Sequence, residues 1–121
     1  MVVSGLSNAE ADRVFQALAD TTRRDILTRA IEREQSVSAL ARRYEMSFAA
    51  VQKHVAVLER AGLVSKQRRG REQIVQTNAP TLRRAMALLD AYEQLWIQRA
   101  TQIADLLAGE EGGQDGADHD P

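Results

Sequence analysis

The side chains best suited to chemistry in this chain of 121 residues lie in two short polar and basic stretches. The first is Gln52-Lys53-His54, and the second is Arg68-Arg69-Gly70-Arg71. A glutamine amide donates and accepts hydrogen bonds side by side, and guanidinium groups bind phosphate oxygens. Neither stretch pairs a nucleophile with a base, as covalent catalysis requires. The chemistry on offer is therefore recognition through hydrogen bonds and charge.

The net charge of −1 conceals an uneven distribution of charge along the chain. Residues 109–121 contain five acidic residues and no Lys or Arg, whereas residues 36–84 contain ten basic residues against three acidic ones. A basic segment of this kind is suited to a polyanion such as nucleic acid. A solvated protein surface can have the same composition, so the charge alone leaves both interpretations open.

Several classes of protein are disfavoured by what the sequence lacks. The chain has no cysteine, which excludes disulfides, thiolate metal sites and cysteine nucleophiles. Of its two histidines, His54 belongs to the polar stretch 52–54 and His119 to the acidic tail, so no convincing nucleophile–base pair can be assembled, and we expect no enzyme. No apolar run approaches the roughly 20 residues that span a bilayer, and no signal-peptide pattern opens the chain. We expect a cytoplasmic protein without membrane contact.

The polar stretch Gln52-Lys53-His54 lies within Ser47–Leu63, which is predicted to form a helix. Ser47 is suited to cap the start of a helix, and Gly62 is suited to the left-handed conformation that ends one, with Leu63 folding back. Apolar residues recur every three or four positions, which predicts an amphipathic helix. These residues are Phe48, Val51, Val55, Leu58 and Ala61. An ordinary surface helix has the same pattern, so the neighbouring elements decide between the two interpretations.

Further helices are predicted before and after this stretch. The first three are expected over 9–19, 21–34 and 37–44. Asn78 and Pro80 open the last, which is expected to continue to about Leu107. The expected caps of the first three are Asn8, then Asp20 or Thr21, then Ser36. Only Glu45 and Met46 then separate the helix over 37–44 from Ser47, so these two helices form a helix-turn-helix.

A basic hairpin is predicted directly after the helix-turn-helix. Residues 63–67 and 73–77 have the period of two expected for strands, and Gly70 is free to take a positive φ in the turn between them. A hairpin in this place is a wing. Charged hairpin tips also occur for solubility alone, but three arginines in four residues favour contact with phosphates or a minor groove.

The terminal helix predicts a homodimer. Leu82, Leu89, Trp96 and Ile103 recur every seven residues in a stripe about 40 Å long, at about 1.5 Å per residue. A domain of this size cannot cover so long a stripe, so a second copy is the expected cover, although a helix folded back on its own core is the alternative. The expected interface comprises Val14, Phe15, Leu18, Leu82, Met86, Leu89, Tyr92, Trp96, Ala100, Ile103 and Leu107.

The predicted fold is mainly α with a small β-hairpin, in the order of four helices, two strands and one helix. We expect a flexible N-terminus over residues 1–8, a winged helix-turn-helix domain for DNA binding and dimerisation over 9–108, and a disordered acidic tail over 109–121.

This order, together with the residues in four segments, resembles the ArsR family of bacterial winged-helix transcriptional repressors. The segments are 15–27, 37–41, 47–64 and 69–72. Two departures stand out: Thr21 replaces the proline frequent at that place, and residues 36–41 lack the cysteines of metal-sensing members. Asp90 and Glu93 on the terminal helix are too few for the metal site of other members. The chain is similar to the metal-independent branch of the family. This resemblance implies that the protein uses no metal and no other cofactor.

The resemblance implies a dimeric repressor that occupies a promoter operator, a pseudo-palindrome in double-stranded DNA. The expected DNA-binding residues are Ser38, Ser47, Phe48, Ala49, Gln52, Lys53, His54, Arg68, Arg69 and Arg71. The alternative is a winged-helix protein-interaction module, but its docking face should be less charged than Gln52-Lys53-His54. The sequence also allows a small-molecule effector of unknown identity to bind near Tyr92 and Trp96.

Overall fold

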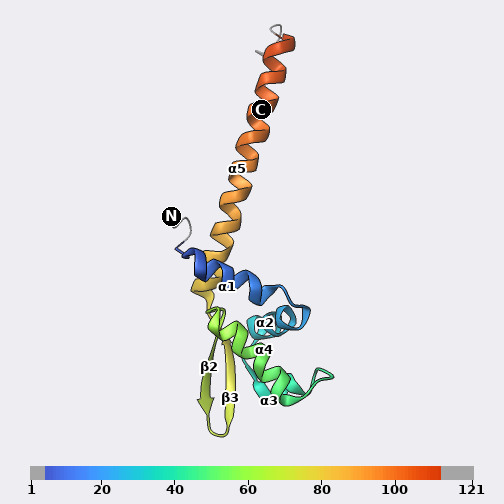
Figure 1. Cartoon of the computed structure of the whole chain (residues 1–121), viewed down its shortest axis with the longest axis vertical. Helices are drawn as coiled ribbons and strands as arrows, with labels where there is room; N and C mark the ends of the chain where they lie inside the picture. Colours follow the sequence, from blue (N-terminus) through green and yellow to red (C-terminus); the bar gives the residue numbers. More distant parts are fainter. Residues whose placement is uncertain (1–4, 113–121) are drawn as a thin grey trace. The chain divides into compact units, whose positions relative to one another are not determined.

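The computed structural model describes the backbone of residues 5–112 and the side chains of residues 5–109 (Figure 1). The chain divides into two compact units, one up to Met86 and one from Ala87 onward. The elements are α1 (Asn8–Leu18), α2 (Thr21–Glu32), β1 (Gln35–Ser36), α3 (Val37–Ala41), α4 (Phe48–Arg60), β2 (Val64–Arg69), β3 (Glu72–Thr77) and α5 (Ala79–Gly112). The predicted winged helix-turn-helix fold is confirmed.

One strand was absent from the prediction. β1 pairs antiparallel with β3, with Gln35 opposite Val75 and Ser36 opposite Ile74, so the sheet has the order β1-β3-β2. A strand of two residues is too short to show the alternation by which strands are recognised in a sequence. The wing is therefore attached to the end of α2 as well as to α4.

The first helix begins one residue earlier than predicted, and its cap is Ser7 instead of Asn8. The Ser7 Oγ accepts from the Glu10 N–H at 3.1 Å, and the Glu10 carboxylate accepts from the Ser7 N–H at 2.8 Å. Glu10 lies three residues after Ser7, which allows this reciprocal capping box. Leu6, within the segment expected to be flexible, is buried in the core, whereas residues 1–4 lie outside the described part.

The connection between α3 and α4 is longer than the two residues predicted. α3 ends at Ala41. The Arg43 N–H then donates to the Leu40 carbonyl, three residues earlier, at 2.9 Å, which is a 3₁₀-type bond at the end of the helix. Tyr44 therefore lies in the turn instead of in the helix, and its side chain packs against the core. The predicted caps Asp20 and Ser36 are confirmed by their bonds to the Arg23 and Ala39 N–H groups.

The helix α4 packs at the centre of the first unit. Val51, Val55 and Leu58 are completely buried, and α4 contacts α1, α2, α3 and β2, so the predicted core face is confirmed at these positions. Phe48, predicted on the same face, is instead 47% exposed. Because Phe48 is the first residue of α4, its side chain lies past the end of the core and remains available for an external contact.

The end of α4 fixes where the wing begins. Gly62 has φ +78°, its N–H donates to the Glu59 carbonyl, and the Leu63 N–H donates to the Leu58 carbonyl. These two bonds form a Schellman motif, as predicted from Gly62. The Lys66 ammonium on β2 lies 3.4 Å from the Glu59 carboxylate, which attaches the wing to α4 a second time. Figure 1 shows the β2–β3 hairpin beside α3 and α4.

The helix α5 begins in the first unit and continues as the only element of the described part of the second. The Asn78 side chain donates to the Gly62 carbonyl at 2.8 Å, and Thr81 and Ala85 are buried. The helix continues past the predicted end at Leu107 to Gly112, so residues 109–112 of the expected tail are helical, and 113–121 lie outside the described part. Over residues 5–112, no helix is long and apolar enough to cross a membrane.

Candidate nucleic-acid interface

One side of α4 is free of the core, and it carries four of the predicted DNA-binding residues. Phe48, Ala49, Gln52 and Lys53 are exposed and fall within an arc of about 140°, at about 100° per residue. Ser47 is exposed just before them, and its Oγ accepts from the Ala50 N–H at 3.1 Å. This bond fixes the first turn of α4, and the Ser47 hydroxyl still has its own proton to donate.

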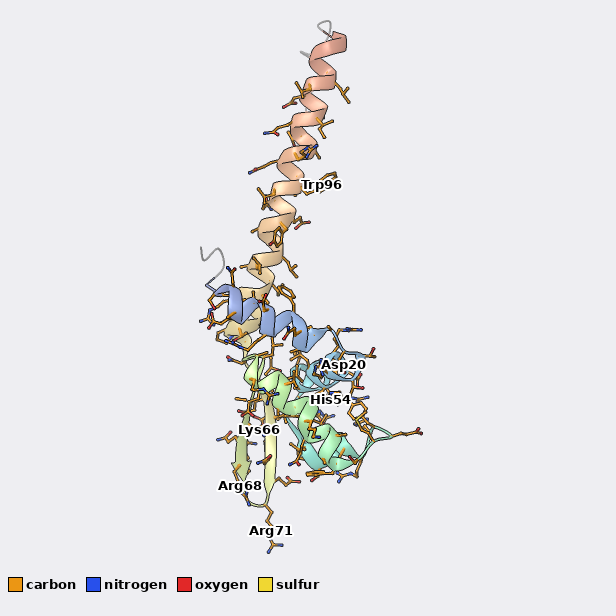
Figure 2. The ribbon with its side chains drawn as sticks, viewed as in Figure 1. Asp20, His54, Lys66, Arg68, Arg71 and Trp96 are labelled. Carbon is orange, nitrogen blue, oxygen red and sulfur yellow. The ribbon has the colours of Figure 1, made fainter. Side chains whose placement is uncertain are left out.

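A groove brings this side of α4 together with α3 and the wing. Its volume is about 220 Å³, and it is lined by Val37, Ser38, Phe48, Gln52, Arg68, Arg71, Glu72 and Gln73. Five of the predicted DNA-binding residues, from three separate elements, thus line one concave surface. Val37, Glu72 and Gln73 were not predicted as site residues. Glu72 follows Arg71 directly in the sequence, and the pairing of β2 with β3 places Gln73 opposite Arg68. Figure 2 shows Arg68 and Arg71 at the far end of the hairpin.

The arginines of the wing have different environments. Arg68 and Arg69 are adjacent on β2, so they point to opposite faces of the sheet. Arg68 lines the groove, whereas Arg69 binds the Glu34 carboxylate through two nitrogens, at 2.8 and 3.2 Å. Hydrogen bonds from Arg69 and Gln76 hold the pKa of Glu34 below its usual value. The structure therefore does not bring Arg69 into the groove, and instead uses it to attach the wing to the segment before β1.

His54 is also directed away from the groove. It lies about 200° around α4 from Gln52, and its Nδ1 is 3.3 Å from the Arg23 Nη1 and 3.8 Å from the Asp20 Oδ2 (Figure 2). The Arg23 backbone N–H lowers the pKa of Asp20, and the charges of Arg23 and His54 lower it further. The sequence places His54 beside Gln52 and Lys53, but the turn of the helix separates them. The structure thus places the His54 side chain at a contact between α4 and α2 and does not bring it into the groove with Gln52.

A polar cluster that the sequence did not predict anchors the turn before α4. The Tyr44 hydroxyl donates to the Asp25 Oδ2 at 2.5 Å, and the Arg29 Nε donates to the same oxygen at 2.9 Å. Burial raises the pKa of Tyr44 to about 12, so the phenol stays protonated at neutral pH, and its bond lowers the pKa of Asp25. Tyr44 and Asp25 are 19 positions apart in sequence, and no local pattern signals their contact.

The residues expected at a dimer interface are divided between the core and the surface. Val14 is completely buried in the first unit, and Leu18 and Leu82 pack against the same core. Val14 therefore cannot contact a second copy, and its prediction is wrong, because core and interface positions look alike in sequence. The other predicted residues are exposed, namely Phe15, Met86, Leu89, Tyr92, Trp96, Ala100, Ile103 and Leu107. Leu95, Ile97 and Leu106 are exposed as well, although they lie beside the predicted stripe.

The part of the chain with described side chains contains no group of three or more His, Cys, Asp or Glu residues that could hold a metal ion. Asp90 and Glu93 belong to no such group there. Apart from Glu72, the polar side chains that line the groove are neutral hydrogen-bonding groups or cations, a combination typical of nucleic-acid recognition.

Comparisons with known proteins agree with this geometry. A family model described as a helix-turn-helix domain matches residues 18–67. The HTH-type transcriptional regulator Rv2034 of Mycobacterium tuberculosis is 35% identical over 99 residues, which cover 82% of this chain and 90% of that protein. An ArsR-like transcriptional regulator from Rhodococcus sp. RHA1 has a TM-score of 0.71 at 35% identity, over 81% of this chain and 92% of that one. The homodimeric winged helix-turn-helix DNA-binding domain Mb0332 of Mycobacterium bovis has a TM-score of 0.58 at 26% identity, over 76% and 93%.

Proposed function

The chain belongs to the ArsR family of winged helix-turn-helix transcriptional regulators, which bind DNA, and we propose that it is a dimeric repressor that occupies a promoter operator. The observation that carries the proposal is the groove in which Phe48 and Gln52 of α4 lie with Arg68 and Arg71 of the wing. One concave surface thereby offers groups for base edges and groups for phosphates.

In the proposed complex, the first turns of α4 enter the major groove. Gln52 is suited to pair with adenine through two hydrogen bonds, and Phe48 and Ala49 are suited to contact the methyl group of thymine. Ser38 and Ser47 add hydroxyl groups at the same end of the helix-turn-helix. Lys53, Arg68 and Arg71 hold phosphates, which fix the position of α4 on the duplex. Their exposed side chains support this assignment. Arg69 and His54 support the interface from within the protein.

The proposed dimer uses the exposed apolar side of α5. Between Met86 and Leu107 this helix exposes large apolar side chains that water solvates poorly, among them Leu89, Tyr92 and Trp96, each more than half exposed. The homodimeric relative Mb0332 supports a symmetric assembly. In it, two copies of α4 would meet half-sites about 34 Å apart, one turn of DNA, which is the basis for proposing a pseudo-palindromic operator. We propose the unit up to Met86 as the DNA-binding part and the rest of α5 as the dimerisation part.

Replacing Gln52 with alanine is expected to change the sequence preference at one base pair of each half-site by about 1–3 kcal/mol, because the paired hydrogen bonds to one base are lost. Binding to operators that carry single base-pair changes measures this effect. Lys53→Ala, the adjacent exposed residue, is the matched control and should weaken binding to every operator alike. An equal loss on all sequences for Gln52→Ala would exclude its role in reading a base.

Replacing Arg71 with alanine is expected to weaken binding to all DNA sequences and to reduce the slope of log K against log salt by about one for each Arg71 that meets DNA. Arg69→Ala removes the same charge from the same hairpin, but from a side chain already bound to Glu34, so its salt slope should stay unchanged. Titrations at four or more salt concentrations measure both slopes. Equal slopes for the two variants would contradict the assignment of the wing.

A mobility-shift assay with the region upstream of the protein's own gene tests the proposed function. We expect a complex that survives an excess of unrelated competitor DNA, and transcription from that region in vitro should fall when the protein is added. Loss of the complex under competitor, or unchanged transcription when the operator is saturated, would contradict a repressor that acts at this region. Absence of binding to any DNA would instead favour a protein-interaction module.

A further inference from the structure

A second groove lies among α1, α2 and the C-terminal end of α4. Its volume is about 370 Å³, and it is lined by Arg13, Gln16, Arg23, Val57, Arg60 and Ala61. Arg60 is the last residue of α4, about 18 Å along the helix axis from Phe48, at about 1.5 Å per residue. Figure 1 shows this end of α4 next to α1, away from the tip of the hairpin. The groove is thus separate from the proposed DNA interface.

Arg23 is held rigidly at the wall of this groove. Its Nε donates to the Ala17 carbonyl at 2.8 Å, its Nη2 donates to the Gln16 carbonyl at 3.0 Å, and its Nη1 lies 3.3 Å from the His54 Nδ1. A guanidinium has five N–H groups, so two remain for another acceptor. Because the contacts to α1 and α4 already fix the side chain, binding an anion here would cost little conformational entropy.

The two other arginines add charge that no carboxylate in the described part of the chain neutralises by an ion pair. Arg13 and Arg60 are exposed, and neither side chain forms a hydrogen bond or a salt bridge with the described residues. Of the nearby carboxylates, Glu59 lies beside Lys66, and Glu10 binds the Ser7 N–H, with the charge of Arg13 also lowering the pKa of Glu10. Three guanidinium groups from three helices therefore line one groove whose lining contains no carboxylate, while Glu10 and Asp20 outside the lining offset part of the charge of Arg13 and Arg23.

We propose that this groove binds a small organic anion that carries a phosphate or carboxylate group. The anionic group would lie among the three guanidinium groups, which bind such oxygens in pairs, and the rest of the molecule would contact Val57 and Ala61. The volume lies within the range of about 300–1,000 Å³ typical of sites for small molecules. The proposal does not rest on the proposed function, because none of the lining residues belongs to the proposed DNA-binding set.

A titration of the full chain without DNA tests this site. It is monitored by NMR through the ¹H–¹⁵N signals of the backbone and of the Arg23 Nε–H. The probes are inorganic phosphate, citrate and glucose 6-phosphate, each against chloride at matched ionic strength. We expect saturable shifts around Arg23 and Arg60 with at least one probe. In the double variant Arg13→Gln/Arg60→Gln, the dissociation constant for that probe should rise at least tenfold. The three probes show whether phosphate or carboxylate is preferred, and whether an organic part adds affinity.

The matched control is Arg33→Gln/Arg42→Gln, which removes the same charge from two exposed arginines outside the groove. Its dissociation constant should stay within twofold of the wild type. The proposal is wrong if no probe gives saturable shifts, if the groove variant retains the affinity, or if the control variant loses as much. A parallel titration with a DNA duplex completes the test: the proposal is also wrong if only the duplex shifts these signals, because the arginines would then be phosphate contacts of DNA.

Discussion

Replacing Trp96 with glutamate is expected to convert the protein to a monomer and to lower its affinity for the operator by more than about a hundredfold. Trp96 is 65% exposed in the single chain and lies on the stripe proposed to meet a second copy. Burying a large apolar side chain contributes about 1.5–3 kcal/mol. A two-fold axis places the residue in the interface twice, so the loss is about 3–6 kcal/mol per dimer, before the cost of desolvating two carboxylates.

The dimer dissociation constant, measured by sedimentation equilibrium, checks this prediction. Gln98→Glu is the matched control, because it adds the same charge about 200° around α5 from Trp96 and should leave the dimer intact. The helical circular dichroism of both variants shows whether they fold. A Trp96→Glu protein that dimerises as the wild type does, or a Gln98→Glu protein that is equally monomeric, would contradict the proposed interface.

Replacing Leu58 with alanine is expected to lower the free energy of unfolding by about 2–5 kcal/mol. Leu58 is completely buried on α4, and the removed methyl groups would leave a cavity in the middle of the core. Its carbonyl accepts from the Leu63 N–H, so a loosened Leu58 would also disturb the point at which the wing begins. We therefore expect weaker DNA binding at temperatures where most of the protein is still folded.

Urea denaturation at one fixed protein concentration measures this loss, because the apparent stability of a dimer depends on concentration. Ile31→Ala serves as the control: it removes a comparable amount of side chain, but from a residue that is 53% exposed on α2, and should cost much less. If the two variants lose equal stability, Leu58 is not at the centre of the core.

The features that sequence alone predicts correctly are those set by neighbouring residues. Ser47, the apolar spacing of Val51, Val55 and Leu58, and Gly62 together define α4, because capping and helical periodicity act within a few positions. The same local rules predict the hairpin and the start of α5. The position of the basic turn follows from Gly70, whose φ is +64°.

The features missed depend on contacts between distant parts of the chain. The bond between Tyr44 and Asp25 and the pair formed by Arg69 and Glu34 join residues 19 and 35 positions apart. No short pattern marks such pairs, and β1, which places Glu34 beside the wing, is too short to be recognised. Val14 shows a different limit: an apolar residue in a core and one in an interface have the same chemistry, and only the packed structure separates them.

Hydroxyl-radical footprinting of the full chain on its own upstream region tests the central claim most directly. The account predicts two protected patches on one face of the duplex, with centres about 34 Å apart and a pseudo-two-fold relation between their sequences. Both patches should disappear together in Trp96→Glu and should change their base preference together in Gln52→Ala. A single patch, or protection that spreads over all sequences and disappears at moderate salt, would contradict a dimer that reads an operator through α4.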